Sequence, residues 1–312
     1  MGARERESEK GDTPMGKSVY DVIAERIIAT LEKGEIPWRK PWSNTPPQNG
    51  EYRNPYRSIN AFILHCAGYA NPFWLTFNQA KKLGACVRKG EHGWPVVKWI
   101  FPDEDEAAKG KRPFPIYYTV FNVQQIDGLD MSKFANPSVV REHTPVEAAE
   151  KVIAGMPKRP TIKTGTRACY CPPLDSVEMP AAETFKSAEA YYRTLFHELV
   201  HSTGHETRLA RKNSMEQIES GSEKYGHEEL VAEMGAAFLA GAAGIDGSEG
   251  LEQSAAYVQH WLKAVKDDPR ALVMAAAQAQ KAADYILDRK APEAVKSEDK
   301  AAEKVEEMAA AV

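Results

Sequence analysis

Apolar side chains recur every three to four positions in several separate stretches of the sequence, which is the spacing of an amphipathic helix. The first stretch, 19–31, has Val19, Ile23 and Ile27 on one face, and Gly34 follows it as a helix-ending residue. The same spacing predicts further helices at 59–66, 78–83, 146–154, 187–203, 228–240, 254–265 and 271–287.

Runs of β-branched and aromatic residues predict the strands. Two of them, 95–101 and 116–123, are expected to form a hairpin whose connection is a long charged loop. Three short strands, at 160–164, 168–171 and 175–179, are separated by proline and glycine signals. The last of these is expected to lie beside the helix 187–203, with an open edge that holds an extended peptide.

These elements predict an α+β protein of two domains. Residues 15–130 form a small α+β domain, and residues 145–288 form a mainly helical domain with a small sheet. The segment 131–144 contains proline turn signals and is interpreted as a linker. Residues 1–14 form a disordered tail and 289–312 a low-complexity tail, because neither has a periodic apolar pattern.

The composition excludes several classes of protein. With 312 residues and 43% hydrophobic residues, the chain is long enough to bury real cores, which excludes fibrous and wholly disordered proteins. Its longest weakly apolar stretch, 230–245, is interrupted by Glu233 and falls short of the roughly 20 residues of a membrane span. The charged start fits no signal peptide, so a cytoplasmic location is expected. Cys169-x-Cys171 is interpreted as two strand residues, since the chain contains no CxxC pair.

Basic and aromatic residues are concentrated in the segment 38–98, although the whole chain has a net charge of −4. This segment has nine Lys and Arg but only two Glu, a net of +7, and it contains four of the six tryptophans. Single-stranded nucleic acid is bound by cationic grooves that follow the phosphates and by aromatic faces on which bases stack. The segment therefore predicts a nucleic-acid site in the first domain.

The candidate contacts of this site begin in a proline-rich loop. Trp38 and Trp42 flank Arg39 and Lys40 there, and at least one of the two rings is expected to stack on a base, because burying both would be difficult. The candidates for phosphate and sugar contacts are Arg53, Tyr56, Arg57, Asn60, Lys81, Lys82, Arg88 and Lys89. The aromatic residues that core packing explains more simply are Trp74, Trp99 and Phe121.

The predicted helix 187–203 carries the pattern His-Glu-x-x-His at His197, Glu198 and His201. Four residues make slightly more than one turn, so both imidazoles project from one face and can share a tetrahedral ion at roughly 2.0–2.1 Å. The surrounding apolar residues favour a buried helix, on which two imidazoles and a carboxylate require a partner. Glu198 lies beside both histidines and is the candidate general base for water.

A catalytic zinc takes three protein ligands and keeps a fourth position open. The third ligand is expected on the helix 228–240, where Glu229 and Glu233 are four residues apart on one face. We assign Glu229 as the ligand and Glu233 as the acceptor of a ring N–H from a ligating histidine. The reverse roles and Glu228 remain alternatives. His205 is a weaker candidate for the third ligand, because the chain turns away there.

This site predicts metal-assisted hydrolysis of a carbonyl group. Zn²⁺, or another divalent ion such as Mn²⁺, would lower the pKa of its water toward about 7, and Glu198 would transfer the proton. Tyr225 is a candidate donor to the oxyanion, with a core aromatic as the alternative. Cleavage of DNA by the metal is less favoured, because a single-metal HExxH site suits carbonyl chemistry.

Two sets of motifs extend these observations to a known family. The first set includes Gly34-x-Ile36-Pro37-Trp38, Tyr56-Arg57-x-Ile59-Asn60, Trp74-Leu75-Thr76-Phe77 and Tyr118-Thr119-Val120-Phe121-Asn122. It resembles the N-terminal domain shared by ArdC-type antirestriction proteins and some plasmid primases. The second set is His197-Glu198-Leu199-x-His201-Ser202-Thr203-Gly204-His205 and Glu228-Glu229-Leu230-Val231-Ala232-Glu233. It resembles the zincin-like metallopeptidase domain of the same proteins.

The resemblance implies an antirestriction protein of mobile, conjugative elements. Such a protein would bind single-stranded DNA, carry a zinc-dependent peptidase-like site and protect incoming DNA from host restriction enzymes, whose subunits are candidate targets. No membrane partner is expected. The alternative is a non-catalytic accessory protein that coats single-stranded DNA and has a structural metal site. Glu198 favours the enzyme, because a structural zinc needs no base beside an open coordination position.

Overall fold

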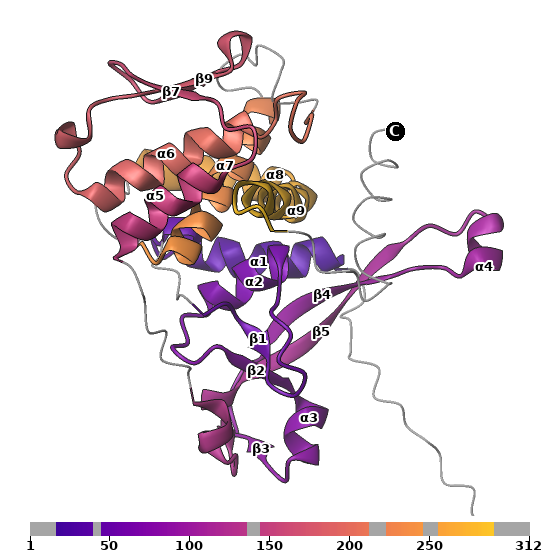
Figure 1. Cartoon of the computed structure of the whole chain (residues 1–312). Helices are drawn as coiled ribbons and strands as arrows, with labels where there is room; N and C mark the ends of the chain where they lie inside the picture. Colours follow the sequence, from indigo (N-terminus) through magenta and orange to yellow (C-terminus); the bar gives the residue numbers. More distant parts are fainter. Residues whose placement is uncertain (1–16, 40–44, 136–143, 212–222, 246–254, 290–312) are drawn as a thin grey trace, which may run out of the picture.

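The computed structural model of the chain describes residues 17–39, 45–135, 144–211, 223–245 and 255–289. Helices and small sheets alternate along it, which confirms the predicted mixed class (Figure 1). The chain begins with α1 (Val19–Leu31), the 3-10 turn η1 (Pro37–Arg39) and α2 (Ser58–Cys66). Ser18 starts α1 through a capping box with Asp21, a local signal that fixes the first turn.

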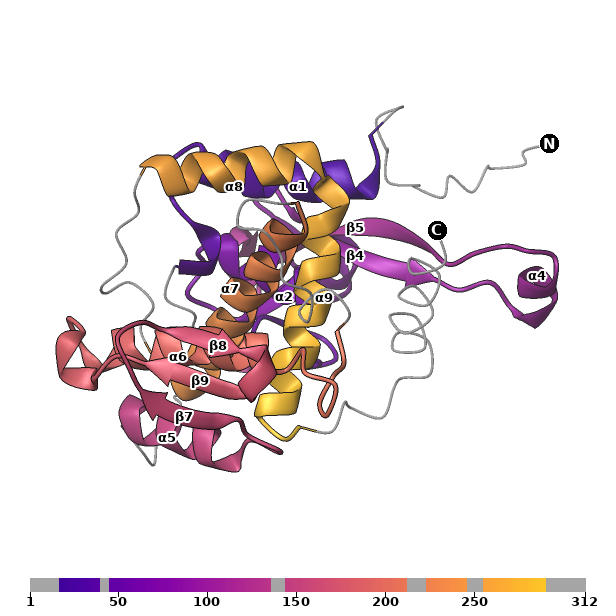
Figure 2. The ribbon, with the colours of Figure 1, turned by 90° about the horizontal axis from the view of Figure 1, so that it is seen from above.

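A four-stranded sheet packs against α1 and α2 (Figure 1). Its order is β1 (Gln48–Asn49), β2 (Phe73–Thr76), β5 (Phe114–Asn122) and β4 (Trp94–Ile100). β1 runs parallel to β2, whereas β2, β5 and β4 pair antiparallel. The predicted hairpin is confirmed as β4 and β5, and its connection carries α4 (Glu104–Ala108) at the end of an arm that projects from the molecule (Figure 2).

A small unit with its own core continues from β2. It consists of α3 (Phe77–Lys82), the paired strands β3 (Cys86–Val87) and β6 (Ile126–Asp127), and the 3-10 turns η2 (Val123–Gln125) and η3 (Met131–Phe134). Phe134 packs against Phe73 with ring centroids 5.8 Å apart, and both rings are buried in this core. The first four residues of the predicted linker 131–144 therefore belong to a folded element.

The second half of the chain consists of α5 (Pro145–Gly155), three short strands, α6 (Ala188–Ser202), α7 (Glu223–Ala243), α8 (Ala255–Asp267) and α9 (Pro269–Ile286). The strands β7 (Thr161–Thr164), β8 (Cys169–Cys171) and β9 (Ser176–Met179) form one sheet in the order β7, β9, β8. β9 lies against α6 as expected, but the open edge predicted for it is wrong, because β9 is the central strand. The edge strand on the antiparallel side is β8.

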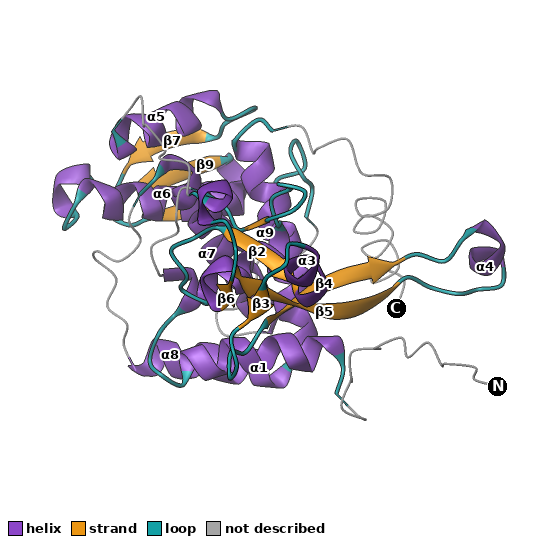
Figure 3. Ribbon diagram, turned by 90° about the horizontal axis from the view of Figure 1, so that it is seen from below, coloured by secondary structure: helices purple, strands orange, loops and turns teal. Residues whose placement is uncertain are grey.

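One hydrophobic core joins the two halves of the chain. Ile27 of α1 and Ile63 of α2 belong to the same buried cluster as Phe196 of α6 and Trp261 of α8. Figure 3 shows α1 alongside α8, and α2 and α9 are also in contact. The division into two domains stays a prediction, but the two segments are packed together rather than held apart. None of the described helices is long and apolar enough to span a membrane.

Candidate metal centre

Both histidines of the HExxH pattern project from the same side of α6. Ser187 starts this helix, since its side chain accepts a hydrogen bond from the backbone N–H of Ala190. The apolar face of α6 is fully buried through Leu195, Phe196, Leu199 and Val200. This packing fixes the helix and brings Nε2 of His197 to 3.1 Å from Nε2 of His201, with the ring centroids 4.7 Å apart.

Glu229 of α7 completes the cluster. Its carboxylate oxygens lie 3.4 Å from Nε2 of His197 and 3.5 Å from Nε2 of His201. The nearer oxygen is Oε2 for His197 and Oε1 for His201. Ligand atoms about 2.0–2.1 Å from a tetrahedral ion are roughly 3.3 Å from each other, so the three side chains are close enough to share one ion. Among the His, Cys, Asp and Glu side chains of the described residues, His197, His201 and Glu229 form the group whose donor atoms lie close enough together to hold a metal ion.

The charges of this cluster favour a cation between its members. Burial alone would lower the pKa of His201, but the hydrogen bonds and charges of Glu228 and Glu229 outweigh burial and raise this pKa to about 10. Burial would likewise raise the pKa of Glu229, yet the two histidines outweigh it and hold the pKa of Glu229 well below its usual range. A positive charge is therefore stabilised at the place where the three side chains meet.

A glycine lets α7 approach α6 closely enough to deliver Glu229. A Cβ atom at Gly235 would lie 2.7 Å and 2.9 Å from the two methyl groups of Val200, closer than side-chain atoms normally come. Val200 is fully buried and has no space into which to move. The contact between the two helices therefore requires glycine at this position.

We expect Gly235→Ala to lower the free energy of unfolding by about 1–3 kcal/mol, because it overpacks the contact between α6 and α7. The matched control is Gly226→Ala on the same helix, where the added Cβ meets nothing within 4 Å. This control should be neutral or stabilising by about 0.5–1 kcal/mol, since alanine is the better helix former. Urea unfolding of both variants measures the difference, and equal effects would contradict the close-packing explanation.

Glu198 lies beside the cluster and is held by the backbone of β8. Only 8% of the residue is exposed, and its Oε2 accepts a hydrogen bond of 2.8 Å from the backbone N–H of Tyr170. This bond fixes the carboxylate on the turn of α6 that carries the two histidines, and Glu198 is not a member of the donor group. The role of Glu198 as a general base stays a prediction.

The strand segment that holds Glu198 is itself braced by an ion pair. Arg208, which is almost fully buried, pairs with Asp175 and also donates to the Tyr170 hydroxyl at 3.3 Å. Asp175 accepts a second hydrogen bond of 2.9 Å from the same hydroxyl. Burial would raise the pKa of Asp175, but Arg208 and Tyr170 outweigh it and lower this pKa. The sequence analysis did not identify Arg208, because no local pattern links it to β8.

The residue that orients His201 is Glu228 and not Glu233. Nδ1 of His201 lies 3.2 Å from Oε1 of Glu228, which is 5% exposed. The sequence-based assignment gave Glu233 the ring N–H of one of the two histidines and kept Glu228 among the alternatives. Residues 228 and 229 are neighbours on α7, so both can face α6. Glu228 contacts Nδ1 of His201, and Glu229 lies near the Nε2 atoms of the two histidines. A role for Glu233 at His197 stays a prediction.

Two other candidates of the metal site are placed differently. His205, the weaker candidate for the third ligand, lies after the end of α6, and its Nδ1 is 2.9 Å from the Thr207 hydroxyl. Tyr225 belongs to the first turn of α7, but its side chain lies outside the described residues. Its role as an oxyanion donor therefore stays a prediction.

Trp38 does not fit the role of a base-stacking residue. Its ring is fully buried, 6.0 Å from the ring of Phe62 and 5.1 Å from that of Trp261. Its carbonyl oxygen accepts a hydrogen bond of 2.7 Å from the buried Arg193 of α6. Of the two rings of which at least one was expected to stack, Trp38 is thus a central core residue, because partners far along the chain cover it. Lys40, Trp42 and the side chain of Arg39 lie outside the described residues.

Asn60 also has a structural role in place of the expected nucleic-acid contact. Its carboxamide donates to the carbonyl oxygen of Val97 at 2.8 Å and accepts from the backbone N–H of Val97 at 2.7 Å. These two bonds pair the outer edge of β4 as a neighbouring strand would. Tyr56 packs against the core, and burial raises its pKa.

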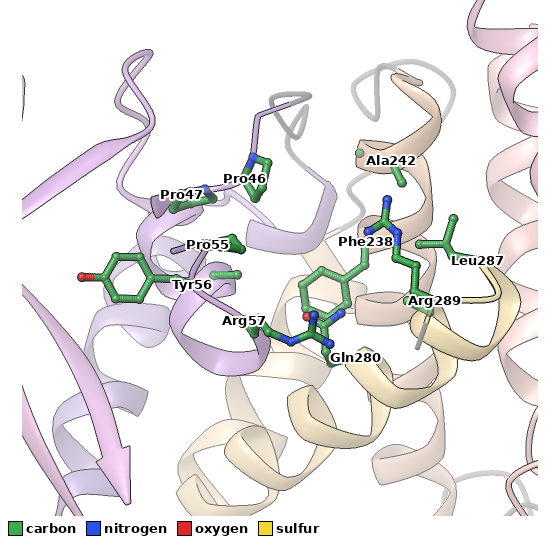
Figure 4. Close-up of a pocket in the computed structure, with 13 residues that line it drawn as sticks. Pro46, Pro47, Pro55, Tyr56, Arg57, Phe238, Ala242, Gln280, Leu287 and Arg289 are labelled. Atoms are coloured by element: carbon green, nitrogen blue, oxygen red, sulfur yellow. The ribbon is translucent and has the colours of Figure 1, made fainter. Parts of the chain in front are cut away.

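Arg57 lies in the seam between the two halves of the chain. It pairs with Asp284 of α9, and the backbone N–H of Ser58 next to it donates to Gln280 at 3.1 Å. A cavity of about 190 Å³ opens beside this contact (Figure 4). Pro46, Pro47, Pro55 and Arg57 line it from one half, and Phe238, Gln280 and Arg289 line it from the other. Arg57 therefore joins α2 to α9 in this arrangement.

The remaining basic candidates surround α3. Lys81, Lys82 and Lys89 are exposed, whereas Arg88 pairs with Glu91 at 2.8 Å. Arg53 places its guanidinium 4.1 Å from the ring centroid of Phe73. Two aromatic residues that the sequence analysis missed are exposed on the same unit, Tyr52 at 64% and Phe77 at 51%. The polar neighbours Glu51, Arg53 and Asn54 are a signal that could have found Tyr52, whereas Phe77 follows the apolar run 73–75, which hid its exposure.

The carboxamide of Asn49 connects two of the segments that carry these residues. Oδ1 of Asn49 accepts from the backbone N–H of Tyr52 at 3.0 Å and from Nε2 of Gln79 at 3.4 Å. It thus links the turn that carries Tyr52 to α3, which carries Phe77, Lys81 and Lys82, while Lys89 follows β3. We call this group of residues the α3 surface: Tyr52, Phe77, Lys81, Lys82 and Lys89.

Two protein families match the chain in succession. Residues 17–121 match the N-terminal domain of the anti-restriction factor ArdC, and residues 147–278 match a zincin-like metallopeptidase family. Among solved structures, the antirestriction protein ArdC of plasmid R388 is similar in its metal-free form, with a TM-score of 0.68 and 38% identity over 87% of this chain and 97% of that protein. Its Mn(II)-bound form gives a TM-score of 0.69 and 39% identity, over 87% and 98% of the two chains.

Similar sequences occur within a much longer relative and in a relative of about the same length. The DNA primase TraC of Escherichia coli is 38% identical over 295 residues, which are 87% of this chain but 20% of the primase. The chain thus spans only about a fifth of the length of that relative. The uncharacterized protein y4eC of Sinorhizobium fredii is 34% identical over 289 residues, which are 86% of this chain and 91% of y4eC.

Proposed function

Because the chain belongs to the family of ArdC-type antirestriction proteins, we propose that it protects single-stranded DNA entering a cell from restriction and that it acts as a zinc-dependent peptidase. The observation that carries the peptidase proposal is the group His197, His201 and Glu229, whose donor atoms all lie within 4.8 Å of one another, with the buried Glu198 on the helix turn that carries the two histidines. The same family includes a protein with Mn(II) bound, which supports a divalent ion in general.

The donor set suits zinc. Two imidazole nitrogens and one carboxylate are the ligands of a zinc site that keeps one position open for catalysis. Mn²⁺ accepts the same ligands but prefers oxygen donors, so we propose Zn²⁺ as the ion with the higher affinity. A divalent ion held here supplies a Lewis acid that polarises a peptide carbonyl and lowers the pKa of water.

The residues of this chain would move the proton and hold the geometry. Glu198 keeps one oxygen on the backbone N–H of Tyr170, which fixes its carboxylate on the helix that carries the two histidines. From there it would accept a proton from the attacking water and return it to the leaving amine. Glu228 would keep the His201 ring turned so that Nε2 faces the other donors. Tyr225 remains the proposed donor to the oxyanion.

We propose that single-stranded DNA contacts the α3 surface. Exposed aromatic rings provide faces for base stacking, and neighbouring lysines provide charges for phosphates. Tyr52 and Phe77 combine with three exposed lysines there, whereas Trp38 and Asn60 are occupied elsewhere. We therefore propose the α3 surface as the main DNA contact in place of the proline-rich loop. Trp42 and Lys40 of that loop remain candidates for further contacts.

Phe77→Ala together with Lys81→Glu and Lys82→Glu should weaken binding of a labelled oligothymidine at least about tenfold, since base stacking alone contributes about 1–3 kcal/mol per base. The slope of affinity against salt should also decrease, because fewer counterions are released. Fluorescence anisotropy at several salt concentrations measures both effects. The matched control is Lys263→Glu, an exposed lysine on α8. If the control and the α3 variant bind equally, DNA does not contact the α3 surface.

Transfer of DNA into a restricting host tests the whole function. Cells that contain the protein should receive unmodified conjugative DNA more efficiently than cells without it, and a non-restricting host should show no difference. His197→Ala should remove this protection if the peptidase is required. The rival function is a DNA-coating accessory protein, and it gains support if His197→Ala still protects while the α3 variant does not. No protection by the wild type would contradict both functions.

A further inference from the structure

Arg211 lies shortly after α6 and is almost entirely buried, although no step of the proposed chemistry uses it. Its side chain is 9% exposed, and that of its partner Glu228 is 7% exposed. The guanidinium engages both oxygens of this carboxylate: Nη2 donates to Oε1 at 2.6 Å, and Nε donates to Oε2 at 3.4 Å. A two-point contact of this kind fixes the plane of the carboxylate as well as its position.

The same guanidinium also holds the last turn of α6. Its Nη2 donates to the carbonyl oxygen of Val200 at 3.0 Å, and its Nη1 donates to the hydroxyl of Thr203. His201 lies between these two residues in the sequence, and its Nδ1 is 3.2 Å from the oxygen of Glu228 that Arg211 binds. Arg211 therefore connects the end of α6 to the carboxylate of α7 that orients His201.

We propose that Arg211 is a positioning residue of the metal centre. It fixes the Glu228 carboxylate relative to the last turn of α6, so that the His201 ring keeps Nε2 directed at the ion. Residues behind the ligands commonly determine metal affinity in this way. The inference rests on the proposed metal site, but it concerns an affinity and requires no peptidase activity.

Lysine cannot reproduce this arrangement. Its single ammonium group cannot reach two carboxylate oxygens and two acceptors on α6 at once, whereas the planar guanidinium has five donors in fixed directions. Arg211→Lys keeps the charge near Glu228 and removes the geometry. This substitution therefore separates positioning from simple charge neutralisation.

Arg208→Lys is the matched control, because it also replaces a buried arginine by lysine. Its side chain is 1% exposed and binds the carbonyl oxygens of Ser202 at 2.7 Å and Lys158 at 2.8 Å. It pairs with Asp175 and not with Glu228. Arg208→Lys thus disturbs an equally buried guanidinium in the same segment without touching the residue that orients His201.

The test is the affinity of the purified full chain for Zn²⁺, measured by competition with a chromophoric chelator. Arg211→Lys should weaken binding about tenfold or more, in the range found for residues behind metal ligands. Arg208→Lys should stay within about threefold of the wild type. Circular dichroism and thermal unfolding of the apo proteins show whether each variant is folded. Equal affinities of folded Arg211→Lys and wild type would overturn the proposal, as would an equal loss in Arg208→Lys.

A double-mutant cycle tests the path through Glu228. If Arg211 acts through this carboxylate, then Arg211→Met combined with Glu228→Gln should weaken Zn²⁺ binding little more than Glu228→Gln does alone. Additive losses would show that Arg211 acts by another route and would overturn the proposal. If the wild type itself binds no Zn²⁺, the proposed metal site fails instead, so the two failures are distinguishable.

Discussion

Glu198→Gln is expected to reduce cleavage of a protein substrate by at least about a hundredfold, because removing a general base typically costs a factor of 10²–10⁴. Glutamine has the same shape as glutamate and can still accept the hydrogen bond from the backbone N–H of Tyr170. The position of the side chain is therefore kept, and only its ability to take a proton is lost. Incubation with purified restriction-enzyme subunits, followed by mass spectrometry of the fragments, measures the effect.

The affinity for Zn²⁺ serves as the internal control for this variant. Glu198 is not one of the three donors of the cluster, so Glu198→Gln should bind the ion within about threefold of the wild type. Glu206→Gln, at an exposed glutamate after α6, should leave cleavage unchanged. Equal cleavage by Glu198→Gln and the wild type would exclude Glu198 as the base. If no protein is cleaved and both forms protect DNA equally, peptidase activity does not explain protection.

Glu229→Ala is expected to weaken Zn²⁺ binding by more than about a hundredfold, because residues behind the ligands already contribute factors of 10–100 and a ligand contributes more. The carboxylate of Glu229 is 3.4 Å and 3.5 Å from the two histidine nitrogens, and no other carboxylate of the described residues joins this donor group. The variant should also lose the increase in melting temperature that added metal gives the wild type.

Glu233→Ala is the matched control, since Glu233 lies one helical turn after Glu229 on the same helix. It should lose about tenfold to a hundredfold in affinity, as expected for a residue behind the ligands, and less than Glu229→Ala loses. The opposite order, with the larger loss in Glu233→Ala, would mean that Glu233 is the ligand and Glu229 its support. Isothermal titration of both variants with Zn²⁺ distinguishes these assignments.

The parts of the site that lie within one helix could be predicted from the sequence. The spacing of His197 and His201 is a local property of α6, and the helical period places both rings on one face. Glu229 was assigned by the same argument, applied to a second helix. Glu233 was assigned as the partner of a ligating histidine, with Glu228 as an alternative. The contact between His201 and Glu228 could not be predicted, because it depends on how α7 is rotated and how closely it packs at Gly235.

The errors in the nucleic-acid site have a different physical cause. A loop with several prolines usually lies on the surface, which suggested that Trp38 is exposed. The ring is buried by Trp261 and the backbone is held by Arg193, more than 150 positions away along the chain. The carboxamide of Asn60 is likewise hydrogen-bonded to the backbone of Val97, in a strand 37 positions further along the chain. Such long-range contacts leave no periodic signal near the residue they cover.

The fold shows the same distinction between local and long-range signals. Helix starts such as Ser18 and Thr144 could be predicted, because a capping box is complete within four residues. The order of β7, β9 and β8 could not, since it depends on pairing between separate segments. Nor did the sequence indicate that α1 and α2 share a core with α8 and α9.

The most direct test of the metal centre is a crystal structure of the protein with Zn²⁺, using anomalous diffraction above and below the zinc absorption edge. The structure predicts one strong peak per chain, about 2.0–2.2 Å from Nε2 of His197, Nε2 of His201 and a carboxylate oxygen of Glu229. Glu198 should lie outside the coordination sphere, with its carboxylate still on the backbone N–H of Tyr170. A peak elsewhere, or a zinc ion ligated by Glu198 in place of Glu229, would contradict this account.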